Sequence, residues 1–144
     1  MSEGVKLTDK EIKYISLFEA ATGASVADCV DSGDVIVFIV NSGELRKVLT
    51  RKGVKIQQLS KMLKKKIKVI EYSSDPSKFL ENALLPAKVI EPVRVTERTD
   101  GRKIAVVTVD PKYKGIAIGK NGKTIELIRL LAKRHHKIDY VIIT

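Results

Sequence analysis

The chain has 144 residues, and its 27 Lys and Arg residues outnumber 17 Asp and Glu residues, giving a formal charge of +10. This length fits one ordinary domain or two small ones, and the share of hydrophobic residues, 44%, is typical of a folded chain. The longest uninterrupted apolar run, Val35 to Val40, is far too short for a membrane-spanning helix. Because Cys29 is the only cysteine, an intramolecular disulfide framework and a multi-cysteine zinc site are excluded. We expect a soluble, cytoplasmic protein without a metal or another cofactor.

The first half begins with a helix followed by a pair of strands. Thr8 and Glu11 have the spacing of a capping box, and Gly23 supplies a helix stop. Two β-rich runs, 25–31 and 34–40, follow, and Ser32-Gly33 between them indicates a hairpin. The rest of this half predicts a short helix near 43–49, a glycine turn at 50–53, a helix over 54–65 and a strand at 66–72.

The second half repeats this order. Asp75-Pro76 predicts the start of a helix at about 76–85, and the runs 87–97 and 103–109 flank Asp100-Gly101, a strong hairpin pattern. The order then continues with a short helical stretch from Pro111 to Ile118, the turn 119–122, a longer helix and a last strand at 137–143.

The two halves align at a constant spacing of 69 residues. Gly53 aligns with Gly122, and Ile56 aligns with Ile125. Since a unit of about 70 residues buries a core only marginally, we expect the halves to pack together. The sequence therefore predicts an α+β fold of two similar domains, 1–74 and 75–144, that form one rigid unit.

The positive charge is concentrated in two blocks at corresponding places in the repeat. Segment 44–68 contains ten basic residues and one acidic residue, and segment 112–137 contains eight and one. A solvated helix face usually mixes both signs, so blocks of one sign favour a polyanionic partner, in particular a nucleic acid.

The most specific motif is the turn Gly119-Lys120-Asn121-Gly122. Glycine at both ends permits a tight path and a close approach of the backbone to a ligand. The turn leads into a helix, whose N-terminal N–H groups and dipole favour phosphate oxygens, and Lys120 and Lys123 add positive charge. Apolar residues flank the turn, and of these we expect Ile118 and Ile125 to be core residues rather than base contacts.

This turn resembles the GXXG loop of KH domains, which clamps about four nucleotides of a single strand. Because the hairpin precedes the loop, each half resembles a type II KH domain. The stretch 79–89, together with Ile116-Ala117-Ile118-Gly119-Lys120-Asn121-Gly122, is similar to the KH pair of the transcription termination/antitermination factor NusA. With no room for the other domains of bacterial NusA, the chain resembles the short archaeal form.

The resemblance implies that both turns contact RNA. In the first turn Thr50 stands where the motif has its first glycine, and a side chain there restricts the backbone. This departure leaves open whether the first loop clamps phosphate, although its positive charge is kept. The residues expected to bind RNA are Gly119, Lys120, Asn121, Gly122 and Lys123, with Thr50, Arg51, Lys52, Gly53 and Lys55.

The sequence gives only weak support for an enzyme or a metal site. Gly122-Lys123-Thr124 ends like a P-loop, but Ala117 occupies the position of the required glycine, and the loop lies between two helices. His135-His136 has no further ligand at metal-binding spacing, so a surface or groove-edge position is expected for both, and Cys29 is expected to be a packed residue.

The expected partner is single-stranded RNA, in the form of a nascent transcript. RNA polymerase is a further candidate partner, whereas a membrane and a small-molecule substrate are not expected. Two alternatives remain open: a protein-docking scaffold that places its basic faces on polymerase or ribosome, and a binder of duplex nucleic acid.

Overall fold

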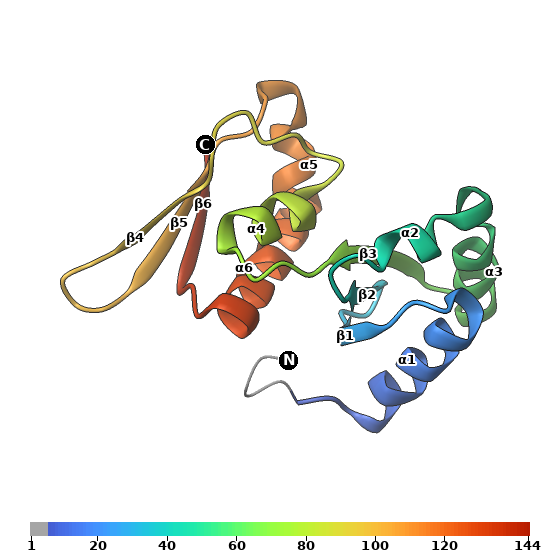
Figure 1. The fold of residues 1–144 in the computed structure, drawn as a ribbon. Helices are drawn as coiled ribbons and strands as arrows, with labels where there is room; N and C mark the ends of the chain where they lie inside the picture. The colour runs from blue at the N-terminus through green and yellow to red at the C-terminus, as the bar shows by residue number, and fades with distance from the viewer. Residues whose placement is uncertain (1–5) are drawn as a thin grey trace. The chain divides into compact units, whose positions relative to one another are not determined.

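The computed structural model describes residues 6–144, with the exception of the side chains of Arg51 and Lys52. The described chain forms two compact units, 6–73 and 74–144. In each unit the order of elements is helix, strand, strand, helix, helix, strand (Figure 1). This order confirms the repeat and the α+β class predicted from the sequence, whereas the packing of the halves as one rigid unit stays a prediction.

The first unit begins with a helix whose two ends are specified locally. The Thr8 Oγ1 accepts from the Glu11 amide at 3.1 Å, and the Glu11 carboxylate accepts from the Thr8 amide at 3.0 Å. At the other end Gly23 is left-handed, with φ of 74°. The elements of this unit are α1 (Asp9–Thr22), β1 (Val26–Asp31), β2 (Val35–Val40), α2 (Leu45–Val48), the 3₁₀ turn η1 (Thr50–Gly53), α3 (Val54–Leu63) and β3 (Lys66–Glu71).

The sheet of the first unit has the strand order β1-β2-β3. β1 pairs antiparallel with β2, and β2 pairs parallel with β3. The central strand β2 is apolar throughout, and alternate residues on it pack against α1 and α3. Phe18 of α1 stacks on Phe38 of β2 with ring centroids 4.2 Å apart, and Cys29 is packed in the same cluster, as predicted.

The second unit repeats this sheet with the order β4-β5-β6, antiparallel and then parallel. Its first helix is capped by Asp75, whose Oδ1 accepts from the Ser77 amide at 3.1 Å, and Pro76 occupies the first turn. The elements are α4 (Pro76–Leu84), β4 (Arg94–Glu97), β5 (Lys103–Val107), the 3₁₀ turn η2 (Pro111–Tyr113), α5 (Lys114–Ile118), the 3₁₀ turn η3 (Lys120–Gly122), α6 (Lys123–His136) and β6 (Tyr140–Ile143).

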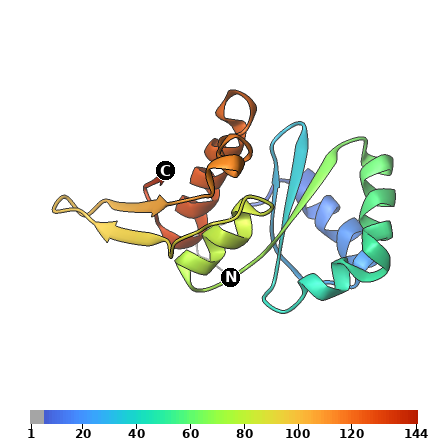
Figure 2. The same ribbon diagram turned by 90° about the horizontal axis from the view of Figure 1, so that it is seen from above.

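The strand predicted over 87–97 is much shorter in the structure. β4 covers only Arg94–Glu97, and the earlier part contributes one isolated bridge, between Val89 and Val109. Pro92 explains the interruption, because proline has no N–H for the ladder. The β4–β5 hairpin turns at the predicted Asp100-Gly101 and extends beyond the rest of its sheet, with all four β4 residues exposed (Figure 2).

The expectation for the histidine pair was wrong for His135. Both histidines lie in the last turn of α6, and His135 is buried there. Their rings lie 5.5 Å (His135) and 5.1 Å (His136) from the ring of buried Phe79. The left-handed Lys137 ends the helix after them, so the final strand begins only at Tyr140.

No helix within residues 6–144 combines the length and apolar character required to cross a membrane.

Asp31 ties the end of β1 to the chain just before β3. Burial by itself would raise the pKa of this carboxyl group, but the Gly33 amide at 3.0 Å and the Lys65 ammonium at 3.1 Å hold it below its ordinary value. The native state therefore favours the ionised form of Asp31, and this contribution to stability is present at neutral pH and lost in acid.

We predict that Asp31→Asn lowers the free energy of unfolding by about 1 kcal/mol at pH 7, because the Lys65 interaction with a charged acceptor is lost. The difference from wild type should shrink as the pH falls from about 4 towards 2, where the wild-type carboxylate becomes protonated. Urea unfolding of both proteins at a series of pH values measures the difference in free energy of unfolding. A difference that stays constant down to pH 2 would contradict this role of Asp31.

Candidate nucleic-acid interface

The predicted turn Gly119–Gly122 connects α5 to α6, and three of its four residues have positive φ. Gly119 has φ 80° and ψ 167°, and Asn121 and Gly122 are left-handed with φ 57° and 72°. The Gly122 amide donates to the Gly119 carbonyl at 3.1 Å and closes the turn. Asparagine tolerates this conformation better than most residues with a side chain, so Asn121 fits its place.

Glycine is required at position 119 also because a side chain there would have no room. A Cβ atom added to Gly119 would lie 2.3 Å from the Thr124 Oγ1 and 2.7 Å from the Thr124 backbone nitrogen. The turn therefore lies directly on the first turn of α6. This close approach positions the exposed Lys120 and Asn121 side by side at the start of that helix.

The first turn, Thr50–Gly53, keeps only the last part of this geometry. Gly53 is left-handed with φ 73°, like its counterpart Gly122, whereas Thr50 lies outside the left-handed region. The Thr50 Oγ1 donates to the Arg46 carbonyl at 3.3 Å and extends the end of α2. The 3₁₀ conformation begins at Thr50 itself, so this turn accommodates a threonine at its first position.

The helices that follow the two turns share an unusual start. Among the four helices of nine or more residues within 6–144, α1 and α4 have side-chain caps, whereas α3 and α6 begin at Gly53 and Gly122 without one. The first N–H groups of a helix have no intrahelical acceptor. In α3 and α6 no side chain of the capping residue occupies this position, although in α6 the Lys123 amide donates to the Lys120 carbonyl. The absence of a cap leaves room for an anion at the other N–H groups of the first turn.

Exposed lysines surround both helix starts. Lys120, Lys123 and Lys55 are exposed, and neither Lys55 nor Lys120 forms an ion pair with any residue that the structure describes. The side chains of Arg51 and Lys52, predicted to bind RNA, lie outside the described part. An acidic side chain, Glu126, is present in the first turn of α6, whereas the first turn of α3 has none.

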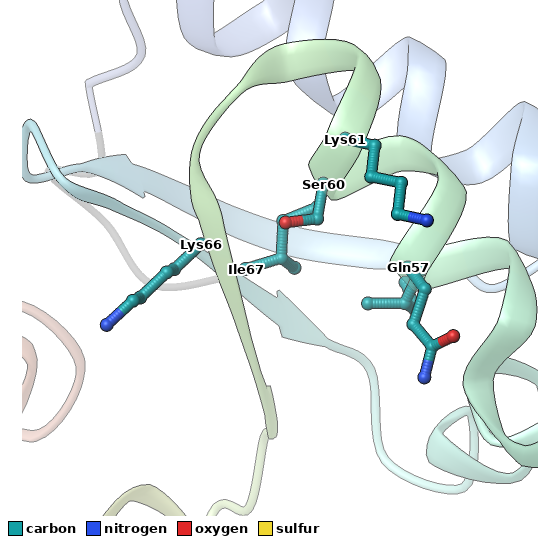
Figure 3. A pocket seen from close by; sticks show the side chains of 6 residues that line it. Gln57, Ser60, Lys61, Lys66 and Ile67 are labelled. Atoms are coloured by element: carbon teal, nitrogen blue, oxygen red, sulfur yellow. The ribbon is translucent and has the colours of Figure 1, made fainter.

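A hollow of about 490 Å³ lies between α3 and the edge strand β3 of the first unit. In Figure 3, Gln57 and Lys61 lie on the helix side, Lys66 points away on the strand side, and Ser60 and Ile67 lie between them. The lining residues are Ile56, Gln57, Ser60, Lys61, Lys66 and Ile67. None of these was predicted as a site residue, because only the parallel pairing of β3 brings its residues next to α3.

In the second unit, α6 and the edge strand β6 occupy the corresponding places. Here the Arg129 guanidinium stacks over the Tyr140 ring, with its carbon 4.2 Å from the ring centroid, and the Arg129 Nε donates to the Val141 carbonyl at 3.1 Å. This pair, too, was not predicted from the sequence. The 69-residue repeat aligns Arg129 with Ser60, which could have directed attention to it.

The apolar residues that flank the second turn differ in how far they are buried. Ile125 is buried, as predicted, and Ile118 is half-buried. Ile116 is 51% exposed and was not singled out from the sequence. The Lys112 ammonium lies over the Tyr113 ring, 5.3 Å from its centroid. The surface near the turn is thus basic with a single exposed aliphatic side chain in α5.

Comparison with known proteins connects this geometry to a family. A family model described as "NusA-like second KH domain" matches residues 76–141. A "Probable transcription termination protein NusA" of Halococcus morrhuae is 36% identical over 135 residues, which cover 94% of this chain and 95% of that protein. The chain belongs to the NusA family.

Further NusA-family similarity extends over nearly the whole chain. A protein of the same description from Methanocaldococcus jannaschii is 31% identical over 137 residues, which cover 95% of this chain and 74% of that protein. The crystal structure of APE1850 has a TM-score of 0.78 and 35% sequence identity, and the match covers 96% of this chain and all of that one. These findings confirm the NusA-like identification and the KH-type α+β fold.

We predict different costs for alanine at the two glycines of the second turn. Gly119→Ala should lower the free energy of unfolding by about 2–3 kcal/mol, because a Cβ there clashes with the Thr124 backbone and φ is positive. Gly122→Ala should cost only about 1 kcal/mol, since its Cβ would meet the Ile125 Cγ2 at an ordinary 3.9 Å. Urea unfolding of both variants measures this, and equal costs would contradict the proposed crowding at Gly119.

Proposed function

We propose that this NusA-family protein binds single-stranded RNA through both glycine turns, as part of transcription termination or antitermination and without catalysis. The observation that carries the proposal is the shared start of α3 and α6: a left-handed glycine, no side-chain cap and exposed lysines beside it. A helix start of this kind attracts phosphate oxygens through its N–H groups and its dipole.

In the second unit, phosphate oxygens would accept hydrogen bonds from N–H groups in the first turn of α6 that follow Lys123, whose own amide donates to the Lys120 carbonyl. At Gly122 the backbone carries no side chain and the space beside it is open, so a phosphate can approach it closely, whereas at Gly119 Thr124 fills the corresponding space. Lys120 and Lys123 would add charge-assisted contacts. Glu126 opposes phosphate binding at this position, so these lysines are needed for net attraction.

In the first unit, the hollow between α3 and β3 supports binding of unpaired bases. Ile56 and Ile67 provide apolar surface, and Gln57 and Ser60 provide hydrogen-bonding groups on its helix side. A base can enter such a hollow only when it is not paired in a duplex, which favours a single strand. Gly53 and Lys55, with Thr50, Arg51 and Lys52 in the same turn, would hold the adjoining backbone.

The first test compares wild type with the Lys120→Asp/Asn121→Asp double variant on a labelled 12-nucleotide single-stranded RNA by fluorescence anisotropy. We expect the variant to bind about tenfold or more weakly, because positive charge at the turn is replaced by negative charge that repels phosphate. Circular dichroism checks that the variant is folded.

A matched control is the Ser74→Asp/Lys78→Asp variant, which makes the same change in net charge at exposed residues outside the turns. Weakening limited to the turn variant supports the proposal. Equal weakening in both variants would mean that net charge alone holds the RNA. An unchanged turn variant would favour the alternative of a protein-docking scaffold on polymerase or ribosome.

The salt dependence of binding is a separate prediction. If about six phosphates are neutralised, log affinity should fall with log salt with a slope of about −4 for a single strand. Titrations between about 50 and 200 mM salt measure this slope. A flat dependence would contradict an interface made of lysines and phosphates, and duplex competing as well as single strand would contradict single-strand selectivity.

A further inference from the structure

The Arg129–Tyr140 pair occupies, in the second unit, the place of the open hollow in the first. In the repeat, Arg129 aligns with Ser60. Tyr140 pairs with Ile104 of β5 in the same register in which Lys66 pairs with Val35 of β2. Ser60 and Lys66 both line the first hollow, so the two units present different chemistry at equivalent positions.

The Arg129 guanidinium is fixed by two contacts. Its Cζ lies over the Tyr140 ring, 4.2 Å from the centroid, and its Nε donates to the Val141 carbonyl at 3.1 Å. Arginine has five N–H donors in a planar fork, and Nε uses one of them. The four N–H donors on the two Nη atoms have no acceptor among the residues that the structure describes. A rigid fork of this kind is suited to a ligand with two adjacent acceptors.

A second hollow, of about 470 Å³, adjoins the same tyrosine. It is lined by Arg98, Arg102, Ile104, Asp139 and Tyr140. The Asp139 carboxylate is already engaged by the Lys133 ammonium and by the Lys103 amide at 2.9 Å, and these contacts hold the pKa of Asp139 below its ordinary value. Arg98 and Arg102, which flank the turn of the hairpin, therefore give this hollow an excess of positive charge, although the Arg102 Nε also lies 3.9 Å from the Asp100 Oδ2.

We propose that the Arg129–Tyr140 pair is the base-reading site of the second unit and that it selects guanine. This inference rests on the proposed binding of single-stranded RNA. The Arg129 Nη groups would donate to O6 and N7 of guanine, the commonest specific contact between arginine and a base. The 46% exposed Tyr140 ring would contact the base, and Arg98 and Arg102 would contact the next phosphate.

The choice of guanine follows from the pattern of acceptors. Adenine presents one acceptor and one donor on the corresponding edge, which a fork of donors cannot match. Cytosine has two adjacent acceptors, O2 and N3, but its smaller ring stacks less strongly. The polar residues that line the hollow of the first unit are Gln57, Ser60, Lys61 and Lys66, and no arginine is among the lining residues that the structure describes, so no guanine preference is expected from them.

The test uses four labelled 12-nucleotide RNAs, one of adenine alone and three with a single central guanine, cytosine or uracil. Fluorescence anisotropy should show that wild type binds the guanine RNA about tenfold more tightly than the others. Arg129→Lys keeps the charge but removes the fork, so it should lose this preference and bind the adenine RNA as wild type does. The control Arg46→Lys, the same change on exposed α2, should keep the preference.

Four results would overturn the inference: equal binding of the four RNAs by wild type, a guanine preference that survives in Arg129→Lys, a cytosine preference carried by Arg129, or equal weakening of all four RNAs in Arg129→Lys. The last would assign Arg129 to a phosphate. Thermal unfolding followed by circular dichroism shows that the variants are folded. If wild type binds none of the RNAs, the proposed function fails as well, which distinguishes that failure from a failure of base selection alone.

Discussion

The left-handed backbone at Gly53 and Gly122 determines where α3 and α6 begin, and the candidate site depends on this constraint. Glycine in that conformation carries no side chain that could cap the helix, so the first N–H groups have no acceptor on the capping side chain. The same residues direct each helix along the edge strand of its own sheet. The position for a phosphate and the surface for a base thus follow from one local conformation in each unit.

Much of the fold could be predicted because its boundaries are encoded locally. Thr8, Glu11 and Gly23 define α1, and Asp75 with Pro76 defines the start of α4, without help from distant residues. The strand expected over 87–97 was wrong in its first part, because Pro92 interrupts a run that is otherwise rich in β-forming residues. For His135 the error concerned burial, because its ring lies beside buried Phe79 of α4, a contact between distant residues that no local pattern reveals.

The candidate site could be predicted only where its residues are contiguous. The turn Gly119–Gly122 is visible as a motif, whereas the hollow beside α3 needs the parallel pairing of β2 with β3. Tyr140 was harder still to find, because α6 has 14 residues and α3 has 10, so the strands after them no longer align at the spacing of the repeat. The two units therefore share a fold, but different residues lie beside the edge strand in each. The difference in helix length hides the correspondence between these residues in the sequence.

The exposed strand β4 has a consequence for the behaviour of the protein at high concentration. It is the outer strand of its sheet, so one side of its backbone has no strand partner in the described chain, and such an edge can recruit a strand from a second molecule. β4 is only four residues long, it begins with Arg94 and ends with Glu97, and Pro92 lies just before it. Short length, charge and a nearby proline all discourage intermolecular pairing. The hairpin can therefore extend into solvent without becoming a nucleus for aggregation.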